Sequence, residues 1–282
     1  MILIVIFQFF QNLRNRYMKI FKYLLILLCL SLVFCKIDSD GDGYLDLDEL
    51  FMKKKPNDPF SRIYEGGWPF NNKKKFIDAP QIDCPNGIGC ECEIIDGVDP
   101  CVEHGGNCIS HFKGDYCSVY NGSIFPEFVA EDQFGEMVNI YDFANNGKYI
   151  LIELGTVWCS PCNTLASLIS YGDNDIKSKG FWKSEYDLII DMIKQEEVYF
   201  ITVLYEDEFR DNATSYTAYE WYDNYPEDNI LVLADEFKIL HSLIKPTGIP
   251  TIILVNENME IVQASTRGFN GAFDKLLDIK AN

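Results

Sequence analysis

The stretch Gly155-Thr156-Val157-Trp158-Cys159-Ser160-Pro161-Cys162 decides how this chain is interpreted. It directly follows an apolar run, residues 149–154, which has the length and composition of a strand buried on both faces. Two cysteines three positions apart at the start of a helix can close a disulfide with little movement of the chain. The dipole and free N–H groups of the helix also stabilise the thiolate form of the first sulfur. The pattern is therefore typical of a redox site, with Cys159 and Cys162 as the reacting pair.

Residues 121–282 alternate between strand-like and helix-like segments around this motif. Strands are expected at 125–130, 137–143, 148–154, 198–204, 230–233, 251–255 and 261–264, and the strand at 137–143 is expected to enter a brief helix. Helices are expected after the cysteine pair and at 182–194, 216–225, 235–243 and from 269 onward. The aromatic cluster of 216–225 is interpreted as a helix surface packed in the core. The alternation predicts an α/β fold, in which a mixed sheet is flanked by helices.

Three motifs of this region resemble the thioredoxin superfamily. They are the Trp-Cys-Ser-Pro-Cys stretch at 158–162, the strand carboxylate Glu153, and the Thr-Gly-Ile-Pro-Thr stretch at 247–251. The extra N-terminal strands and an export signal resemble the TlpA-like thiol-disulfide oxidoreductases of bacterial envelopes. The resemblance implies a thioredoxin-like mixed sheet. It also implies that Cys159 is an exposed nucleophile that attacks a substrate disulfide, and that Cys162 resolves the mixed disulfide.

The same resemblance gives roles to four further residues. Glu153 lies six residues before Cys159 and takes up the proton of the resolving thiol, and burial is expected to raise its pKa. Pro250 matches a cis-proline that faces the cysteine pair, while Ile249 and Trp158 contact the substrate. The implied partners are protein dithiols or disulfides and an upstream electron carrier, and the redox chemistry needs no cofactor. The direction of electron flow stays open, although Ile249 before Pro250 resembles the reducing thioredoxins.

The first 35 residues are predicted to be an export signal. A cationic stretch at 18–22 precedes an apolar run at 23–34, which is shorter than a typical membrane-spanning helix. Met18 is an alternative start, and both lipidation of Cys35 and ordinary cleavage after it stay open. The expected location is the periplasm, the outer surface or the medium, with a membrane anchor through lipidated Cys35 as one alternative. The net charge of −19 argues against nucleic acid as a partner.

Residues 38–49 fill every position of an EF-hand calcium loop. The expected Ca²⁺ ligands are Asp38, Asp40, Asp42, the carbonyl of Tyr44, Asp46 and Glu49. No entering helix fits before the loop and no second loop pairs with it, so it resembles the isolated calcium loops of exported bacterial proteins. The alternative is an acidic linker without a metal. The loop and the linker after it are expected to span 36–82.

The linker itself carries few structural signals. A short helix is expected at 45–55, and the Pro- and Gly-rich residues 57–81 are predicted to form a connector without regular structure. Two short lysine runs, 53–55 and 73–75, are interpreted as solvated linker charge.

Residues 83–120 form a loop-rich segment in which six cysteines are concentrated: Cys84, Cys90, Cys92, Cys101, Cys108 and Cys117. Export to an oxidising compartment predicts three structural disulfides, whose pairing the sequence leaves open. Part of the segment resembles an EGF-like module. A zinc site of Cys90, Cys92, His104 and His111 is the alternative.

The favoured function is that of a thiol-disulfide oxidoreductase acting on protein disulfides in the cell envelope or outside the cell. Two alternatives stay open. Peroxiredoxins share the fold and place a threonine three residues before their cysteine, as Thr156 does here, but Ile152 occupies the position of their required proline. The chain could also be a calcium-dependent surface binding module in which the thioredoxin-like domain is only a scaffold.

Overall fold

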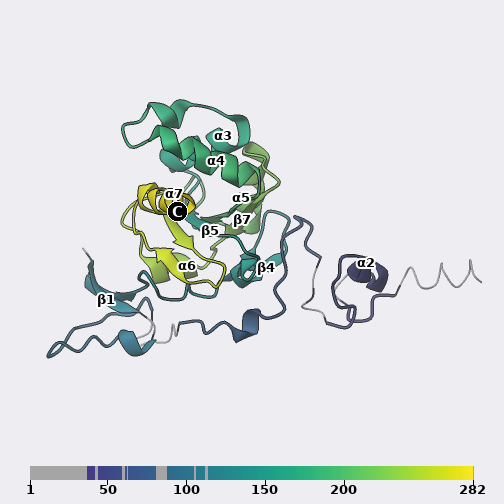
Figure 1. Ribbon diagram of the computed structural model, residues 1–282, viewed down its shortest axis with the longest axis horizontal. Helices are drawn as coiled ribbons and strands as arrows, with labels where there is room; N and C mark the ends of the chain where they lie inside the picture. Colours follow the sequence, from purple (N-terminus) through teal and green to yellow (C-terminus); the bar gives the residue numbers. More distant parts are fainter. Residues whose placement is uncertain are drawn as a thin grey trace, which may run out of the picture. The chain divides into compact units, whose positions relative to one another are not determined.

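The computed structural model describes residues 37–41, 44–58, 61, 63–80, 88–104, 106–111 and 114–281 (Figure 1). The predicted export signal with Cys35, the loop positions Asp42 and Gly43, and Cys84 lie outside the described residues. The chain divides into two compact units, residues 1–63 and 64–282. Within the described ranges, none of the helices has the length and apolar character needed to cross a membrane.

The first unit contains the short helix α2, Asp46–Phe51, at the C-terminal end of the candidate calcium loop. The carboxylate of Asp46 accepts hydrogen bonds from the N–H and the hydroxyl of Ser39, both at 2.7 Å. Glu49 lies in the first turn of α2 and is fully buried. The helix is shorter than the predicted 45–55, because Lys53 has a φ of 58° and this left-handed backbone cannot continue it.

The cysteine-rich segment of the second unit contains an antiparallel hairpin of β1, Asn107–His111, and β2, Gly114–Ser118. Two disulfides, Cys92–Cys108 and Cys101–Cys117, tie the preceding loop to the two strands, and Cys90 is disulfide-bonded as well. The predicted disulfide-bonded segment is therefore confirmed. The zinc alternative is wrong, because the sulfurs of Cys90 and Cys92 are used in disulfides.

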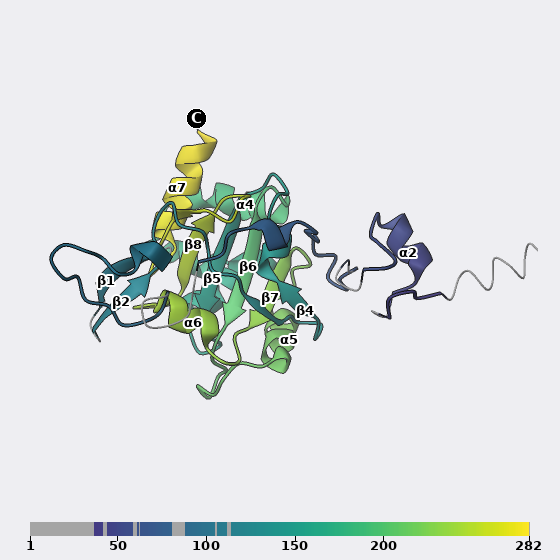
Figure 2. The same cartoon turned by 90° about the horizontal axis from the view of Figure 1, so that it is seen from below.

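A five-stranded mixed sheet forms the centre of the second unit, with the strand order β7-β6-β5-β8-β9 (Figure 2). Its strands are β5, Ile150–Gly155; β6, Tyr199–Leu204; β7, Ile230–Ala234; β8, Thr251–Val255; and β9, Ile261–Gln263. Strands β5, β6 and β7 are parallel, whereas β8 and β9 run antiparallel to their neighbours. A separate two-stranded ladder pairs β3, Val129–Glu131, with β4, Met137–Asn139.

Helices cover both faces of the sheet, which explains why its central strands are apolar throughout. One face packs against α3, Ser160–Tyr171; α4, Asp187–Lys194; α5, Ser215–Asn224; and α7, Asn270–Lys280. The other face packs against α6, Ile239–Ile244, and the 3-10 helix η3, Ile140–Phe143. Alternate residues of β5 supply the two cores, as expected for a strand with a side-chain period of two. The predicted fold class, a mixed sheet flanked by helices after a disulfide-bonded segment, is confirmed.

Two helices start later than the sequence predicts. Asp235 lies before α6 because its carboxylate accepts hydrogen bonds from the N–H groups of Ile239 and His241, at 2.6 and 2.9 Å. Within the predicted helix 182–194, residues 184–186 form the separate 3-10 helix η5, Ser184–Tyr186, and before it the ring of Trp182 packs edge-on against Phe269, with a centroid separation of 5.9 Å. A third difference is in α5, where Trp221 is buried but Tyr216 is exposed, so its aromatic cluster is only partly core.

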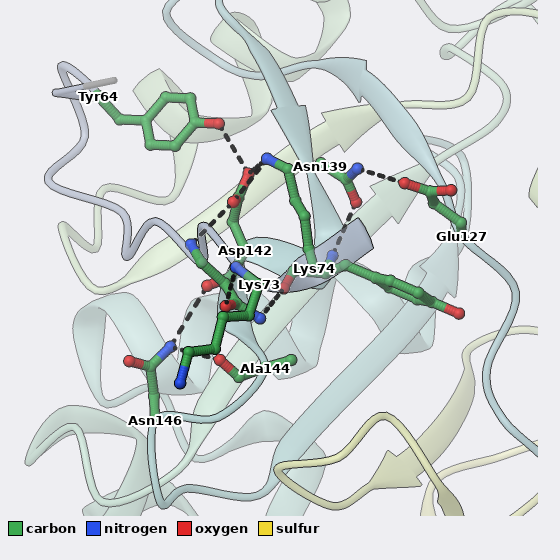
Figure 3. A network of polar contacts seen from close by, with 10 residues as sticks. Tyr64, Lys73, Lys74, Glu127, Asn139, Asp142, Ala144 and Asn146 are labelled. Carbon is green, nitrogen blue, oxygen red and sulfur yellow. Dashed lines mark hydrogen bonds and ion pairs between the residues drawn. The ribbon is translucent and has the colours of Figure 1, made fainter. Parts of the chain in front are cut away.

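Residues 64–77 are not the free connector that the sequence predicts. Trp68 is buried against the ring of Phe143, and its indole N–H donates to Asp132 at 2.8 Å. The carboxylate of Asp142, which is fully buried, accepts from the hydroxyl of Tyr64 at 2.9 Å and from the ammonium of Lys74 at 2.7 Å (Figure 3). The interpretation of the 73–75 lysines as solvated charge is therefore wrong for Lys74.

Replacement of Asp142 by alanine should destabilise this attachment strongly, because it leaves the donors of Tyr64 and Lys74 without their buried acceptor. We expect a loss of about 3 kcal/mol in the free energy of unfolding. Urea titration measures it, and Glu197→Ala is the matched control, since Glu197 pairs with Lys280 in an exposed ion pair worth less than about 1 kcal/mol. Equal losses in the two variants would show that residues 64–77 are not held by this network.

Candidate functional site

The central strand of the sheet places the cysteine pair. β5 ends at Gly155, and after a short loop α3 begins at Ser160, so that Cys159 is the N-cap residue of the helix. Pro161 lies in the first turn, where a missing backbone N–H costs nothing. Cys159 and Cys162 form a disulfide with a Cα–Cα distance of 5.3 Å, and the Cys159 sulfur accepts from the Cys162 N–H at 3.2 Å. A helix N-terminus at this sulfur favours its thiolate form.

Both sulfurs are covered in this disulfide form. Cys159 is 2% exposed and Cys162 is 1% exposed, whereas the family resemblance implies an exposed first cysteine. The expected exposure is wrong for this state, because the disulfide lies in the apolar core next to α3, with Val157 and Ile249 packed against the same cluster.

Glu153 lies on β5, two residues before the strand ends at Gly155, and its side chain is buried. Its Oε2 accepts a hydrogen bond from the Thr202 hydroxyl on β6 at 3.1 Å, and its Oε1 has no hydrogen-bond partner among the described residues. Burial raises the pKa of Glu153 to about 7, because the loss of hydration outweighs the stabilising hydrogen bond from Thr202. The carboxyl group can therefore exchange a proton near neutral pH.

Gly155 leaves space between this carboxyl and the sulfur of Cys162, and sequence reasoning gave this glycine no role. A Cβ at position 155 would lie 3.3 Å from the Cys162 sulfur and 3.7 Å from Glu153 Oε1. Since the glycine has no Cβ, the space shared by these two atoms stays open. The available signal was a glycine at the end of an otherwise apolar strand, which often marks a close approach.

Pro250 is placed at the same end of the sheet by the pairing of β5 with β8. The Ile249–Pro250 peptide bond is cis, as the resemblance implies. Leu154 pairs with Thr251 in the antiparallel register. Pro250, which directly precedes Thr251, therefore lies at the end of β5, where the loop to Cys159 begins. The Pro250 carbonyl accepts from the Gly268 N–H at 2.7 Å, which fixes the backbone here.

Trp158 is held by charged side chains that the sequence did not identify. Its indole N–H donates to Glu206 at 2.9 Å, and the guanidinium of Arg210 lies 4.2 Å from the ring centroid. Lys238 donates to the other oxygen of Glu206 at 2.7 Å. Burial opposes ionisation of Glu206, but the hydrogen bonds from Lys238 and Trp158 hold its pKa below the usual value. These contacts fix a partly exposed indole beside the cysteine pair.

The candidate calcium ligands belong to the first unit, whereas the cysteine pair belongs to the second unit. Among the described ligands, the Asp38 carboxylate accepts from the Gly41 N–H at 2.7 Å, and Asp46 accepts from Ser39. Asp40, Tyr44 and Glu49 are also described. The donors are carboxylate and carbonyl oxygens, and a fully buried carboxylate at Glu49 suits a hard cation such as Ca²⁺.

The fold and the disulfide at the start of α3 define the class: an α/β protein with a Cys-x-x-Cys site. Several solved structures are similar to part of this chain. The chain is similar to the thioredoxin domain of a thiol-disulfide oxidoreductase from Bacteroides vulgatus, with 23% identity, a TM-score of 0.38, and coverage of 57% of this chain and 99% of that one. It is also similar to the exposed lipoprotein thioredoxin of Streptococcus pneumoniae, with 21% identity, a TM-score of 0.37, and coverage of 54% and 96%.

A third similar structure is a putative thiol:disulfide interchange protein DsbE from Chlorobium tepidum. It shares 17% identity with a TM-score of 0.41, and the match covers 57% of this chain and 98% of that one. No family model matches the chain, and no curated protein matches it either.

Replacing Glu153 with glutamine should change how stability depends on pH. The folded protein binds more protons than the unfolded chain between about pH 4.5 and 7, since the pKa of Glu153 rises from 4.5 to about 7 on folding. The unfolding free energy of the wild type should therefore fall by about 3 kcal/mol, relative to the variant, as the pH rises through this window. Urea titrations of the oxidised proteins measure it. Glu131→Gln, at an exposed position, is the control, and identical pH profiles for Glu153→Gln and wild type would contradict the raised pKa.

Proposed function

We propose that this protein is a thiol-disulfide oxidoreductase that acts on protein disulfides in the cell envelope or outside the cell. The observation that carries the proposal is the Cys159–Cys162 disulfide at the N-terminus of α3, with the buried carboxyl of Glu153 behind it. Perturbed titratable groups next to a reactive pair are typical of functional sites. A purely structural disulfide would need no proton acceptor near neutral pH.

The reduced pair acts in two steps. The Cys159 thiolate attacks one sulfur of a substrate disulfide, so a mixed disulfide forms while the second substrate sulfur leaves as a thiolate. Glu153 then accepts the proton of Cys162 across the space left by Gly155. The Cys162 thiolate attacks the Cys159 sulfur, the mixed disulfide breaks, and the first substrate sulfur leaves. Two electrons have passed from the pair to the substrate, and the reverse sequence oxidises a substrate dithiol.

The export of the protein is supported by two independent features. Residues 18–34 have the charge and apolar pattern of a signal, and the cysteine-rich segment contains disulfides that persist only in an oxidising compartment. The substrates in this proposal are therefore exported proteins, and an upstream carrier supplies or removes the electrons. Either release or a lipid anchor at Cys35 would keep the redox site on the same side of the membrane.

The division of labour between the two cysteines predicts which variant traps a substrate. Cys162→Ser should accumulate a mixed disulfide through Cys159, because the resolving thiol is absent, whereas Cys159→Ser should trap nothing. Non-reducing electrophoresis and mass spectrometry of the adduct measure this. Ser160→Ala keeps both thiols and should release its substrate as the wild type does. Trapping by Cys159→Ser alone would reverse the assignment.

We also propose that the 38–49 loop binds Ca²⁺. The support is the complete set of oxygen ligands at EF-hand spacing, together with the burial of Glu49 at the twelfth position. The ion would hold Asp38, Asp40, Asp42, the Tyr44 carbonyl, Asp46 and Glu49 in one loop, and its charge would balance the carboxylates.

Calcium binding should be weak and should depend on Glu49. Calorimetric titration of the full chain is expected to give a Kd of about 0.1–1 mM, and Glu49→Gln should raise it at least about ten-fold, since a bidentate anionic ligand is lost. Asp58→Asn removes a carboxylate outside the loop and should leave the Kd unchanged. The absence of a heat signal at millimolar Ca²⁺ in the wild type would reject the proposal.

A further inference from the structure

A groove of about 600 Å³ adjoins the redox site. One wall is formed by Val157 and Asn163, which lie on either side of the cysteine pair in the sequence and are joined by a hydrogen bond from the Asn163 amide to the Val157 carbonyl at 3.0 Å. The other lining residues come from the loop after β6 and from α5. Since the backbone N–H of Val157 donates to the Glu206 carbonyl at 3.1 Å, the loop is attached directly to the segment that leads into Cys159.

All the charged side chains among the described residues that line this groove are acidic, namely Asp207, Glu208 and Glu220. The Asp207 carboxylate accepts from the N–H groups of Phe209 and Asp211, at 2.8 and 2.9 Å, which shapes the loop. Arg210 is in the same loop but does not line the groove, because its guanidinium lies over the ring of Trp158. The groove therefore presents negative charge without a lining cation.

Aromatic side chains accompany these carboxylates. Phe209 is 76% exposed and Tyr216 is 65% exposed, and both line the groove together with the buried Trp221. Exposed aromatic rings next to carboxylates form a surface that a lysine or arginine side chain fits, because its cation pairs with the carboxylates and its stem and charge pack on the rings.

The N-terminus of α5 also borders the groove and would by itself attract an anion. That attraction is reduced here, because Thr214 and Thr217 form a capping box. The Thr214 hydroxyl accepts from the Thr217 N–H, and the Thr217 hydroxyl accepts from the Thr214 N–H. The backbone donors at this end are therefore partly used within the helix, while the carboxylates of Glu208 and Glu220 stay exposed.

We propose that this groove binds a basic segment of the substrate protein, with lysine or arginine close to the disulfide that Cys159 attacks. The proposal rests on the thiol-disulfide exchange proposed above and adds the class of substrate. The segment would lie between α5 and the loop after β6. In this position, its disulfide would lie near the end of β5. Binding there raises the local concentration of the substrate sulfur at Cys159 without a change in the exchange chemistry.

The test compares two peptides that each contain one intramolecular disulfide and differ only in flanking lysines or flanking glutamates. The full exported chain is reduced, freed of reductant and mixed with each peptide in a single turnover. We expect the lysine peptide to be reduced at least about ten-fold faster at low salt, and this preference should shrink as salt screens the charges.

Variants connect the preference to the groove. Glu208→Lys/Glu220→Lys should abolish or invert it. Glu185→Lys/Asp191→Lys makes the same change in net charge at exposed positions outside the groove and should retain it. Equal rates with the two peptides in the wild type, or equal losses in both double variants, would overturn the inference.

A small uncharged disulfide, hydroxyethyl disulfide, separates this inference from the proposal on which it rests. Wild type and both double variants should reduce it at the same rate, which also shows that the variants are folded. Failure of the wild type to reduce this compound would reject the thiol-disulfide function itself. Normal reduction without discrimination between the peptides would reject only the basic-segment groove.

Discussion

The burial of β5 on both faces is the constraint on which the rest of the second unit depends. A strand with apolar side chains on both faces needs a packed layer above and below it. Helices α3, α4, α5 and α7 supply one layer, and α6 with residues 64–77 supplies part of the other. The same burial places Glu153 among apolar residues and raises its pKa, so the packing that stabilises the fold also produces the titratable group behind the cysteines.

The cysteine pair uses the geometry that follows from this strand. Because β5 leads into α3, Cys159 comes at the helix N-terminus, and because β8 pairs with β5, the cis Ile249–Pro250 bond comes at the same end of the sheet. Gly155 keeps the space between Cys162 and Glu153 free. Local chain direction, strand pairing and one missing side chain together build a site in which a thiol and a carboxyl can exchange a proton.

Segments outside the central sheet modify this site without belonging to its chemistry. The loop after β6 supplies Glu206 and Arg210, which hold Trp158, and it forms one wall of the acidic groove. Residues 64–77 fill the other core through Trp68 and through the contacts of Lys74 with buried Asp142. In a chain with a net charge of −19, Lys74 neutralises the buried carboxylate of Asp142, Lys238 neutralises the partly buried carboxylate of Glu206, and Arg210 covers the ring of Trp158.

The sequence by itself determined the α/β class and the cysteine pair, because both depend on local pattern: apolar runs, short spacings and residue type. The buried acid and the cis-proline were expected only because the motifs around Glu153 and Pro250 resemble a known family. The attachment of residues 64–77 and the exposure of Tyr216 were decided only by the tertiary structure, since they depend on parts of the fold that are far away in the chain. The role of Gly155 was also hidden from the sequence, although its neighbours Glu153 and Cys162 are close in the chain. An absent Cβ has meaning only when the atoms it would have touched, on α3 and within β5, have been brought together by folding.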